Sequence, residues 1–275
     1  HLPSDLRRLP REALPQVCQE LRQAIIHSLA DNPGHFASSL GVVELTVALH
    51  YVFDTPYDRI VWDVGHQAAG HKMLTGRMDD FCTYRHLHGL RPFPSPEESE
   101  YDTFACGHAS NSISAALGMA VADQQTGQTG RHVVAVIGDG SMSGGLAYEG
   151  LNNAGASHEP LIVILNDNGM SINPHVGAMP SHLSRLRSKP AYYHFKKWYR
   201  SLFGKHPMEN GLYRFNHRVK SSLKKTLWPG STLFEDMGFT YLGPIDGHDL
   251  PRLCDVLEWA RELNSPVVVH VNTIK

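Results

Sequence analysis

The hydrophobic residues of this chain gather in short continuous runs, and between these runs they recur with helical spacing. Residues 133–137, 161–165 and 266–271 are rich in Val, Ile and Leu without alternation, and residues 59–65 give a further short run. Runs of this kind are typical of strands that are buried on both faces, as in parallel sheets. They predict several short strands in the core.

The spacing of apolar residues between these runs predicts five helices. We expect the second to begin at a Ser38 or Ser39 cap, the fourth to end at a left-handed Gly155, and the last to begin at Asp249 and Pro251. The predicted helices cover residues 15–30, 38 or 39 to 51, 108–123, 141–154 and 249–263. Strands that alternate with helices predict the α/β class, as a doubly wound, mostly parallel sheet with helices on both faces.

Two polar side chains follow neighbouring predicted strands. Asp139 lies in a Gly-Asp-Gly turn after one strand, and Asn168 follows the next strand along the chain. A strand, helix and parallel strand form a right-handed unit, so we expect the two strand ends to lie side by side at the edge where ligands bind. Mg²⁺ prefers oxygen ligands and commonly keeps substrate phosphates among them. The pattern predicts a magnesium diphosphate site; Asn152 and Asn153, inside the crossover helix, come too early to contribute.

Length and composition fit one compact domain over residues 1–275. The chain is 41% hydrophobic and carries a formal net charge of −2, which argues against a general nucleic-acid binder. Residues 174–230 differ, being rich in basic and aromatic residues, and we interpret them as a mobile helical insert that packs on the domain or a neighbour. Contact of this insert with RNA or phosphate-rich ligands is the alternative.

The remaining sequence features bear on compartment and on proton chemistry. The four cysteines show no CxxC spacing, so we expect buried thiols of a reducing compartment. We find no apolar run approaching ~18 residues and no leader pattern, so we expect neither a membrane span nor a signal peptide. Among 18 histidines, His35 and His66 lie in loops of small residues and suit proton transfer; the alternative is that they only hydrogen-bond the backbone of their loops. His71 and His248 are interpreted as structural.

Five segments together carry a family resemblance. The segments 34–53, 61–77, 98–120, 164–172 and 233–249 include GHFASSLG, DVGHQ, ACGHAS, LNDNGMSI and GPIDGHD. In this order they resemble the 1-deoxy-D-xylulose-5-phosphate synthase family of transketolase-like enzymes. The resemblance implies the thiamine diphosphate-binding fold and, as cofactors, thiamine diphosphate and Mg²⁺.

The resemblance also implies roles for individual residues. Asp139, Asn168 and the carbonyl of Met170 would ligate Mg²⁺, and the amides of Gly140 and Ser141 would bind the diphosphate. His66 would contact the cofactor and His35 the substrate. Gly107, His108 and Ala109 correspond to a segment that lines the cofactor, although Ala109 lacks the hydroxyl group that is usual there. Ser141 and Gly169 also depart from the most frequent residues, but neither change removes a metal ligand.

The implied reaction condenses pyruvate with glyceraldehyde 3-phosphate and releases CO₂, in isoprenoid precursor, thiamine and pyridoxal pathways. We expect a cytoplasmic bacterial homodimer that binds neither nucleic acid nor membrane. The family has two further domains, one of which supplies the glutamate that activates the cofactor ring, so we expect this chain alone to be inactive. Three interpretations stay open here: an incomplete N-terminal part of the synthase, the N-terminal subunit of a split transketolase, and a non-catalytic module that binds thiamine diphosphate.

Overall fold

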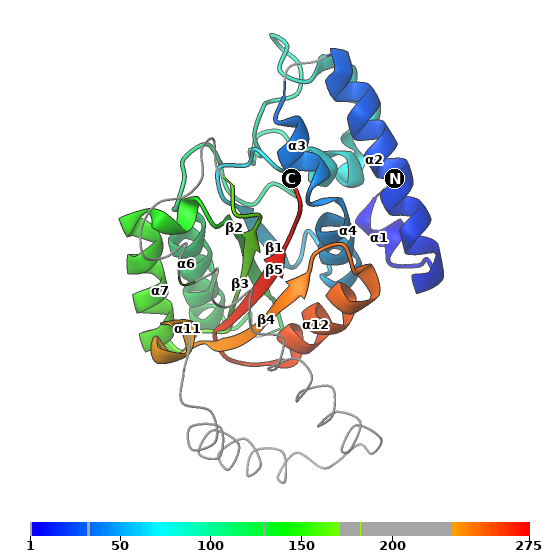
Figure 1. The fold of residues 1–275 in the computed structure, drawn as a ribbon. Helices are drawn as coiled ribbons and strands as arrows, with labels where there is room; N and C mark the ends of the chain where they lie inside the picture. The colour runs from blue at the N-terminus through cyan, green and yellow to red at the C-terminus, as the bar shows by residue number, and fades with distance from the viewer. Residues whose placement is uncertain (1, 32–33, 129, 171–181, 183–232) are drawn as a thin grey trace.

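A five-stranded parallel sheet forms the centre of the molecule. The computed structural model describes residues 2–31, 34–128, 130–170, 182 and 233–275 (Figure 1). The strands lie in the order β1-β2-β3-β5-β4, and every neighbouring pair is parallel. Their bounds are Arg59–Trp62, Val133–Gly138, Leu161–Asp167, Thr240–Asp246 for β4 and Val267–Asn272 for β5. The predicted α/β class and parallel sheet are therefore confirmed.

Helices cover both faces of this sheet (Figure 1). One core joins strand residues such as Trp62 and Val134 to α2, α4 and α12, and the other joins Ile137 and Val163 to α6 and α7. The helices of the first face are α2 (Leu14–Asp31), α4 (Val43–Val52) and α12 (Leu250–Glu262), and those of the second are α6 (Ser112–Gln125) and α7 (Gly145–Ser157). Successive strand residues thus pack on opposite layers, which explains the uninterrupted apolar runs.

Two predicted helix starts were wrong. Ser38 and Ser39 do not cap a helix, because they are buried inside α3 (Phe36–Leu40), which ends before α4 begins. The helix expected from residue 108 begins at Ser112, since Ser110 has a φ of 74°. A left-handed residue cannot continue a right-handed helix, and the sequence offered no glycine there to mark it.

The predicted end of α7 was also wrong. Gly155 lies inside the helix, which continues to Ser157, and His158 takes the left-handed position with a φ of 58°. Gly155 has a packing role instead, because a Cβ atom there would lie 1.8 Å from the carbonyl oxygen of Met237. The glycine allows α7 to approach the turn that leads into β4.

One further helix start was predicted correctly and one strand was missed. The helix beginning at Asp249 is confirmed, since the Asp249 carboxylate accepts a hydrogen bond from the Arg252 amide. β4 was missed, because Gly243 and Pro244 interrupt its apolar pattern. The short segments α1, α5 and α11 and the 3-10 and π turns were not predicted either; they are Pro3–Leu6, Ala69–Lys72, Leu233–Asp236, Arg11–Ala13, Met73–Arg77, Asp79–Thr83 and Ser141–Ser143. The predicted insert at 174–230 lies outside the described residues except for 182.

The four cysteines are free, as predicted, but only Cys18 and Cys254 are buried, and Cys82 is exposed. The expectation of four buried thiols was therefore wrong at Cys82, which lies in the short helical turn Asp79–Thr83, and at Cys106, which is only partly buried. None of the helices that the structure describes is long and apolar enough to cross a membrane.

Candidate active site

The candidate site lies where β2 and β3 end. The register pairs Gly138 with Asn166, and the Asp139 amide donates to the Asn166 carbonyl over 3.1 Å. The Gly169 amide in turn donates to Asp139 Oδ2 over 2.9 Å. The predicted juxtaposition of Asp139 with the turn that carries Asn168 is therefore confirmed. Asp139 is buried, with an exposed fraction of 6%, so its carboxylate is shielded from bulk water.

The turn after β3 is closed by its own side chains. Asp167 Oδ1 also accepts from the Gly169 amide, over 3.1 Å, and Asn168 Oδ1 accepts from the Met170 amide over 3.0 Å. Gly169 has a φ of 69°, a conformation that glycine adopts without strain. An acidic residue, which the resemblance implies as the usual one here, would occupy this left-handed conformation at a cost.

His35 and His66 lie together beside this edge. Their rings meet edge to face with centroids 5.5 Å apart, and His35 also lies 6.4 Å from the ring of Phe93. Burial, followed by the charges of His35 and Lys275, lowers the pKa of His66 to about 4. His66 is therefore neutral near pH 7, and its Nδ1 has no hydrogen-bond partner among the described residues.

Two cations that the sequence interpretation missed lie near these histidines. Arg85 places Nη2 3.3 Å from His35 Nδ1, and the pKa of His35 is lowered by burial and then by Arg85 and Lys275. Neither cation lies in a motif that the strand and helix pattern could single out. Both charges disfavour protonation of the neighbouring histidines, and they would attract an anionic ligand beside them.

The loop of Gly107, His108 and Ala109 is exposed and is fastened to the same edge. The Ser110 amide donates to Asp63 Oδ1 over 2.9 Å, and Ser110 Oγ donates to the Ser141 carbonyl over 2.7 Å. Asp63, at the end of β1, thus fixes this loop beside the Gly-Asp-Gly turn. The sequence interpretation missed Asp63, because it extended the predicted strand over residues 59–65, whereas β1 ends at Trp62 and Asp63 directly follows it.

The DVGHQ segment is also linked to the end of β3. Gln67 Oε1 accepts from Asn166 Nδ2 over 3.0 Å, so Gln67 and its neighbour His66 are held beside the end of β3, whose Asn166 carbonyl also accepts from the Asp139 amide. Gln67 Nε2 is buried and has no hydrogen-bond partner among the described residues. A buried donor in this position indicates room for an acceptor from a ligand or water.

The donor set fits a magnesium diphosphate group. Asp139 supplies a buried carboxylate, Asn168 an amide oxygen with a second lone pair, and Met170 a backbone carbonyl, all on adjacent turns. A Cβ atom added at Gly138, which ends β2, or at Gly145, which begins α7, would meet nothing within 4 Å, so space is open at both ends of the segment that carries Asp139. These residues are oxygen donors beside this open space, as a hard divalent cation and its phosphate ligands require.

The two asparagines excluded from the site lie elsewhere, and His248 has local partners. Asn152 and Asn153 are exposed on α7, and Asn153 Nδ2 donates to the Glu149 carbonyl over 3.0 Å. His248 is held between Glu44 and the Ile274 amide, at 3.2 and 3.1 Å. The exposed position of the two asparagines agrees with the sequence interpretation, while the structural role of His248 stays a prediction.

His71 is buried in an ion cluster with His50, Asp102 and Arg77. Its Nε2 lies 2.8 Å from Asp102 Oδ1, and Arg77 binds the same carboxylate through two nitrogens. This arrangement supports the structural role that the sequence predicted for it.

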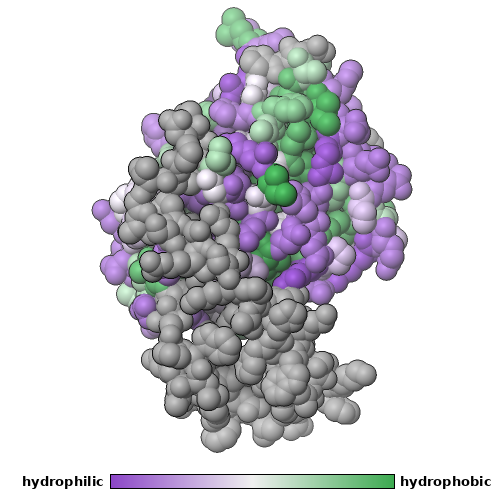
Figure 2. Space-filling view, in the orientation of Figure 1, coloured by the Kyte–Doolittle hydropathy of each residue, from purple (hydrophilic) through white to green (hydrophobic). Residues whose placement is uncertain are grey.

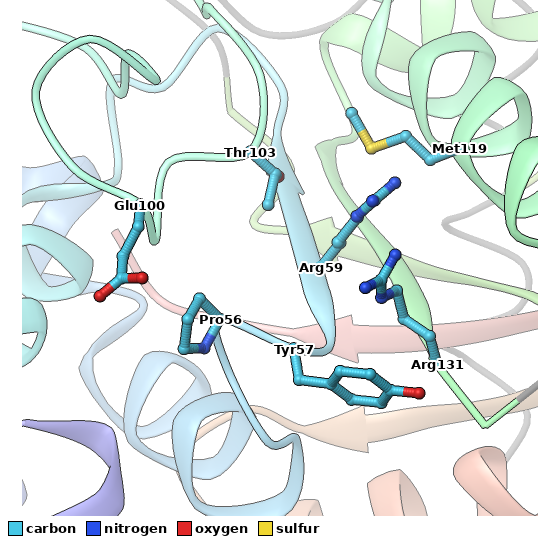
Figure 3. Close-up of a pocket in the computed structure, with 7 residues that line it drawn as sticks. All are labelled: Pro56, Tyr57, Arg59, Glu100, Thr103, Met119 and Arg131. Atoms are coloured by element: carbon cyan, nitrogen blue, oxygen red, sulfur yellow. The ribbon is translucent and has the colours of Figure 1, made fainter. Parts of the chain in front are cut away.

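A cavity of about 650 Å³ lies at the opposite, amino edge of the sheet (Figure 3). Arg59 and Arg131 point toward each other across it, and both pair with Asp123, at 3.6 and 2.9 Å. Arg131 also stacks on the ring of Tyr57, 4.9 Å from its centroid. The arginines thus have local partners, and the cavity is remote from the candidate site.

Apolar side chains are exposed on the face that carries the chain end. Phe36 in α3 is 41% exposed and Ile274, just after β5, is 78% exposed. Figure 2 shows apolar side chains gathered over α3, while most of the remaining coloured surface in this view is polar. A patch of this kind is typical of a surface that contacts another protein segment.

Comparison with known proteins supports the resemblance seen in the sequence. The chain is 58% identical to 1-deoxy-D-xylulose-5-phosphate synthase of Phocaeicola vulgatus and 57% identical to that of Bacteroides fragilis, over 99% of its length. The chain covers 43% and 42% of these two relatives, which is about two-fifths of their length. Among solved structures, transketolases of Leishmania mexicana and Campylobacter jejuni align over 99% and 94% of the chain and 37% and 38% of their own, with TM-scores of 0.66 and 0.64.

The transketolases are 19% and 22% identical to this chain, so they show the fold alone. The model of the 1-deoxy-D-xylulose-5-phosphate synthase N-terminal region matches residues 1–273. The chain therefore belongs to the 1-deoxy-D-xylulose-5-phosphate synthase family.

Proposed function

We propose that this chain is the diphosphate-binding part of a 1-deoxy-D-xylulose-5-phosphate synthase. The enzyme would condense pyruvate with glyceraldehyde 3-phosphate, with loss of CO₂, using thiamine diphosphate and Mg²⁺, and would supply isoprenoid precursor and thiamine pathways. The observation that carries the proposal is the contact between Asp139 and the turn of Asn168, in a chain of this family. A cytoplasmic homodimer belongs to the same proposal.

Different residues at the carboxyl edge of the sheet would bind the metal ion and the diphosphate of the cofactor. Asp139, Asn168 and the carbonyl of Met170 would hold Mg²⁺, and the amides of Gly140 and Ser141 would donate to the diphosphate. Gly107, His108 and Ala109 would line the cofactor through backbone contacts. Thiamine diphosphate, when bound, supplies the electron sink for decarboxylation of a 2-keto acid.

The histidines and cations would serve the substrates. Neutral His66 and His35 can accept or donate a proton at a ring nitrogen near pH 7, His66 beside the cofactor and His35 beside the substrate. Arg85 and Lys275 would attract the carboxylate of pyruvate and the phosphate of glyceraldehyde 3-phosphate. Two substrates that are both anionic fit a site with two cations and two neutral imidazoles.

The comparisons favour this activity over that of a transketolase subunit. Identity to the named synthases is 57–58%, against 18–22% for the transketolases. A non-catalytic module would need no neutral histidine pair beside the metal turn, so the geometry favours an enzyme.

The direct test uses the complete product of the gene that encodes this chain. We expect Mg²⁺-dependent and thiamine diphosphate-dependent release of CO₂ from pyruvate when glyceraldehyde 3-phosphate is present, with 1-deoxy-D-xylulose 5-phosphate as product. Transfer of a two-carbon unit from xylulose 5-phosphate to an aldose phosphate, without consumption of pyruvate, would support the transketolase reading instead. Cofactor binding without either reaction would support the non-catalytic module.

A further inference from the structure

A buried chain of hydrogen bonds leads across the sheet to the metal-binding turn. Tyr241 on β4, His270 on β5 and Asp167 on β3 lie on three adjacent strands. The Tyr241 hydroxyl lies 2.6 Å from His270 Nδ1, and His270 Nε2 lies 2.9 Å from Asp167 Oδ2. All three are buried, with exposed fractions of 4%, 0% and 2%.

The chemistry of Asp167 fixes the direction of its bond to His270. A carboxylate can only accept, so His270 donates from Nε2 to Asp167, and its Nδ1 is left to hydrogen-bond the Tyr241 hydroxyl. The Tyr241 ring is itself stacked on Phe234, with centroids 5.9 Å apart and an interplanar angle of 2°. The chain of bonds therefore starts from a ring held by packing and ends at the carboxylate of Asp167.

Asp167 links this hydrogen-bond chain to the turn that carries Asn168 and Met170. Its second oxygen, Oδ1, accepts from the Gly169 amide, the same amide that donates to Asp139 Oδ2. Its backbone carbonyl accepts from the Thr273 amide over 3.0 Å, which ties the turn to the residue that follows β5. Gly169 lies between Asn168 and Met170, so whatever fixes its amide also fixes the two residues that would ligate the metal.

We propose that Asp167 is a positioning residue for the metal-binding turn, with His270 and Tyr241 holding it from behind. The proposal rests on the proposed function, because it assigns the purpose of a network beside the proposed magnesium ligands. Buried polar groups in a sheet are often no more stabilising than apolar residues of the same size, so stability alone gives little reason for this network. Residues behind metal ligands commonly change metal affinity about 10–100-fold when replaced.

Four variants separate positioning from general stability. His270→Leu removes both hydrogen bonds, His270→Gln returns an amide that can donate to Asp167, and Tyr241→Phe removes one hydroxyl and is the variant least prone to misfold. His132→Leu is the matched control, because His132 Nδ1 pairs with Asp58 Oδ1 at 3.0 Å at the amino edge of the same sheet.

The first readout is amide hydrogen exchange of the ligand-free protein, which needs no bound metal. We expect the Gly169 amide to exchange about tenfold or more faster in His270→Leu, less so in Tyr241→Phe, and near the parent rate in His270→Gln and His132→Leu. Equal exchange at Gly169 in His270→Leu and His132→Leu, or a uniform rise across all strands, would overturn the proposal.

The second readout is calorimetric titration of Mg²⁺ into the complete gene product in the presence of thiamine diphosphate. We expect about 10–100-fold weaker Mg²⁺ binding for His270→Leu and recovery for His270→Gln. Unchanged affinity in His270→Leu contradicts the proposal. A parent protein that binds no Mg²⁺ would overturn the proposed function instead, and faster exchange at Gly169 would still support the positioning of the turn.

Discussion

His66 shows how position within the fold sets the chemistry of a single residue. Its ring lies in a partly buried loop beside His35 and near Lys275, and each of these surroundings disfavours the charged form. An imidazole that stays neutral over the whole physiological range is available as a base or hydrogen-bond donor without first losing a proton.

The pKa of His66 can be measured directly. We expect its imidazole to titrate at about 4 in the folded chain, against about 6.5 in the unfolded chain. Because the folded pKa is lowered, the contribution of His66 to stability is complete above about pH 6.5 and declines as the pH falls toward 4. Histidine NMR, with assignment by His66→Gln, checks this value; a titration near 6.5 in the folded chain would show that the ring is not held neutral.

Replacing either histidine should lower turnover without unfolding the chain. We expect His66→Ala and His35→Ala each to reduce the rate of pyruvate consumption in the complete gene product by about 10²–10⁴-fold, as for loss of a proton-transfer group. Thermal unfolding should change little, because His35 is exposed, His66 is half-buried in a loop, and neither ring belongs to the two cores. Rates at the parental level in both variants would make these histidines structural.

Some of the site residues could be predicted because the ends of buried apolar strands are recognisable in the sequence. Asp139 and Asn168 directly follow buried strands, so parallel topology alone places them together. Arg85 and Lys275 gave no such signal, because their proximity to His35 depends on loops whose course follows no periodicity. Asp167 was passed over because its role depends on His270, a partner distant in sequence.

At the scale of elements, α7 is placed by one glycine. Gly155 lets the helix touch the turn before β4, where the Met237 carbonyl would lie 1.8 Å from any added Cβ atom. Since the obstacle is backbone, a larger side chain cannot be accommodated by a rotamer change.

Gly155→Ala should therefore destabilise the chain by about 2–3 kcal/mol, in the range of overpacked cores. The matched control is Gly118→Ala in α6, where an added Cβ atom meets nothing within 4 Å and helix propensity should stabilise by up to about 1 kcal/mol. Chemical denaturation of both variants tests the pair. A Gly155→Ala variant as stable as the parent would show that the α7 contact is loose.

A strand or helix could be predicted from the sequence where a single pattern of apolar residues determines it. Strands β2, β3 and β5 are buried on both faces and therefore read as continuous apolar runs. β4 lies at the sheet edge and contains Gly243 and Pro244, so the same signal was absent. Helix boundaries failed where a left-handed non-glycine residue, Ser110 or His158, ended or delayed the helix.

At the scale of the whole molecule, the chain spans about two-fifths of its relatives. We expect residues 1–275 alone to bind thiamine diphosphate weakly with Mg²⁺ and to leave pyruvate unconsumed, because the resemblance assigns ring activation to another domain. Addition of the remaining part of a close relative should restore turnover. Sustained consumption of pyruvate by the purified chain, with its mass confirmed, would contradict this division of labour.

The most direct test of the account is calorimetric titration of thiamine diphosphate, with and without Mg²⁺, into the parent and three variants of the complete gene product. Asp139→Asn should abolish the Mg²⁺-dependent part of binding, because it removes the carboxylate that a hard cation requires. Asn168→Ala should be nearly as damaging, and Asn153→Ala on the exposed face of α7 should bind as the parent does. Equal losses from Asn153→Ala and Asn168→Ala, or unchanged binding by Asp139→Asn, would contradict the assignment of the site.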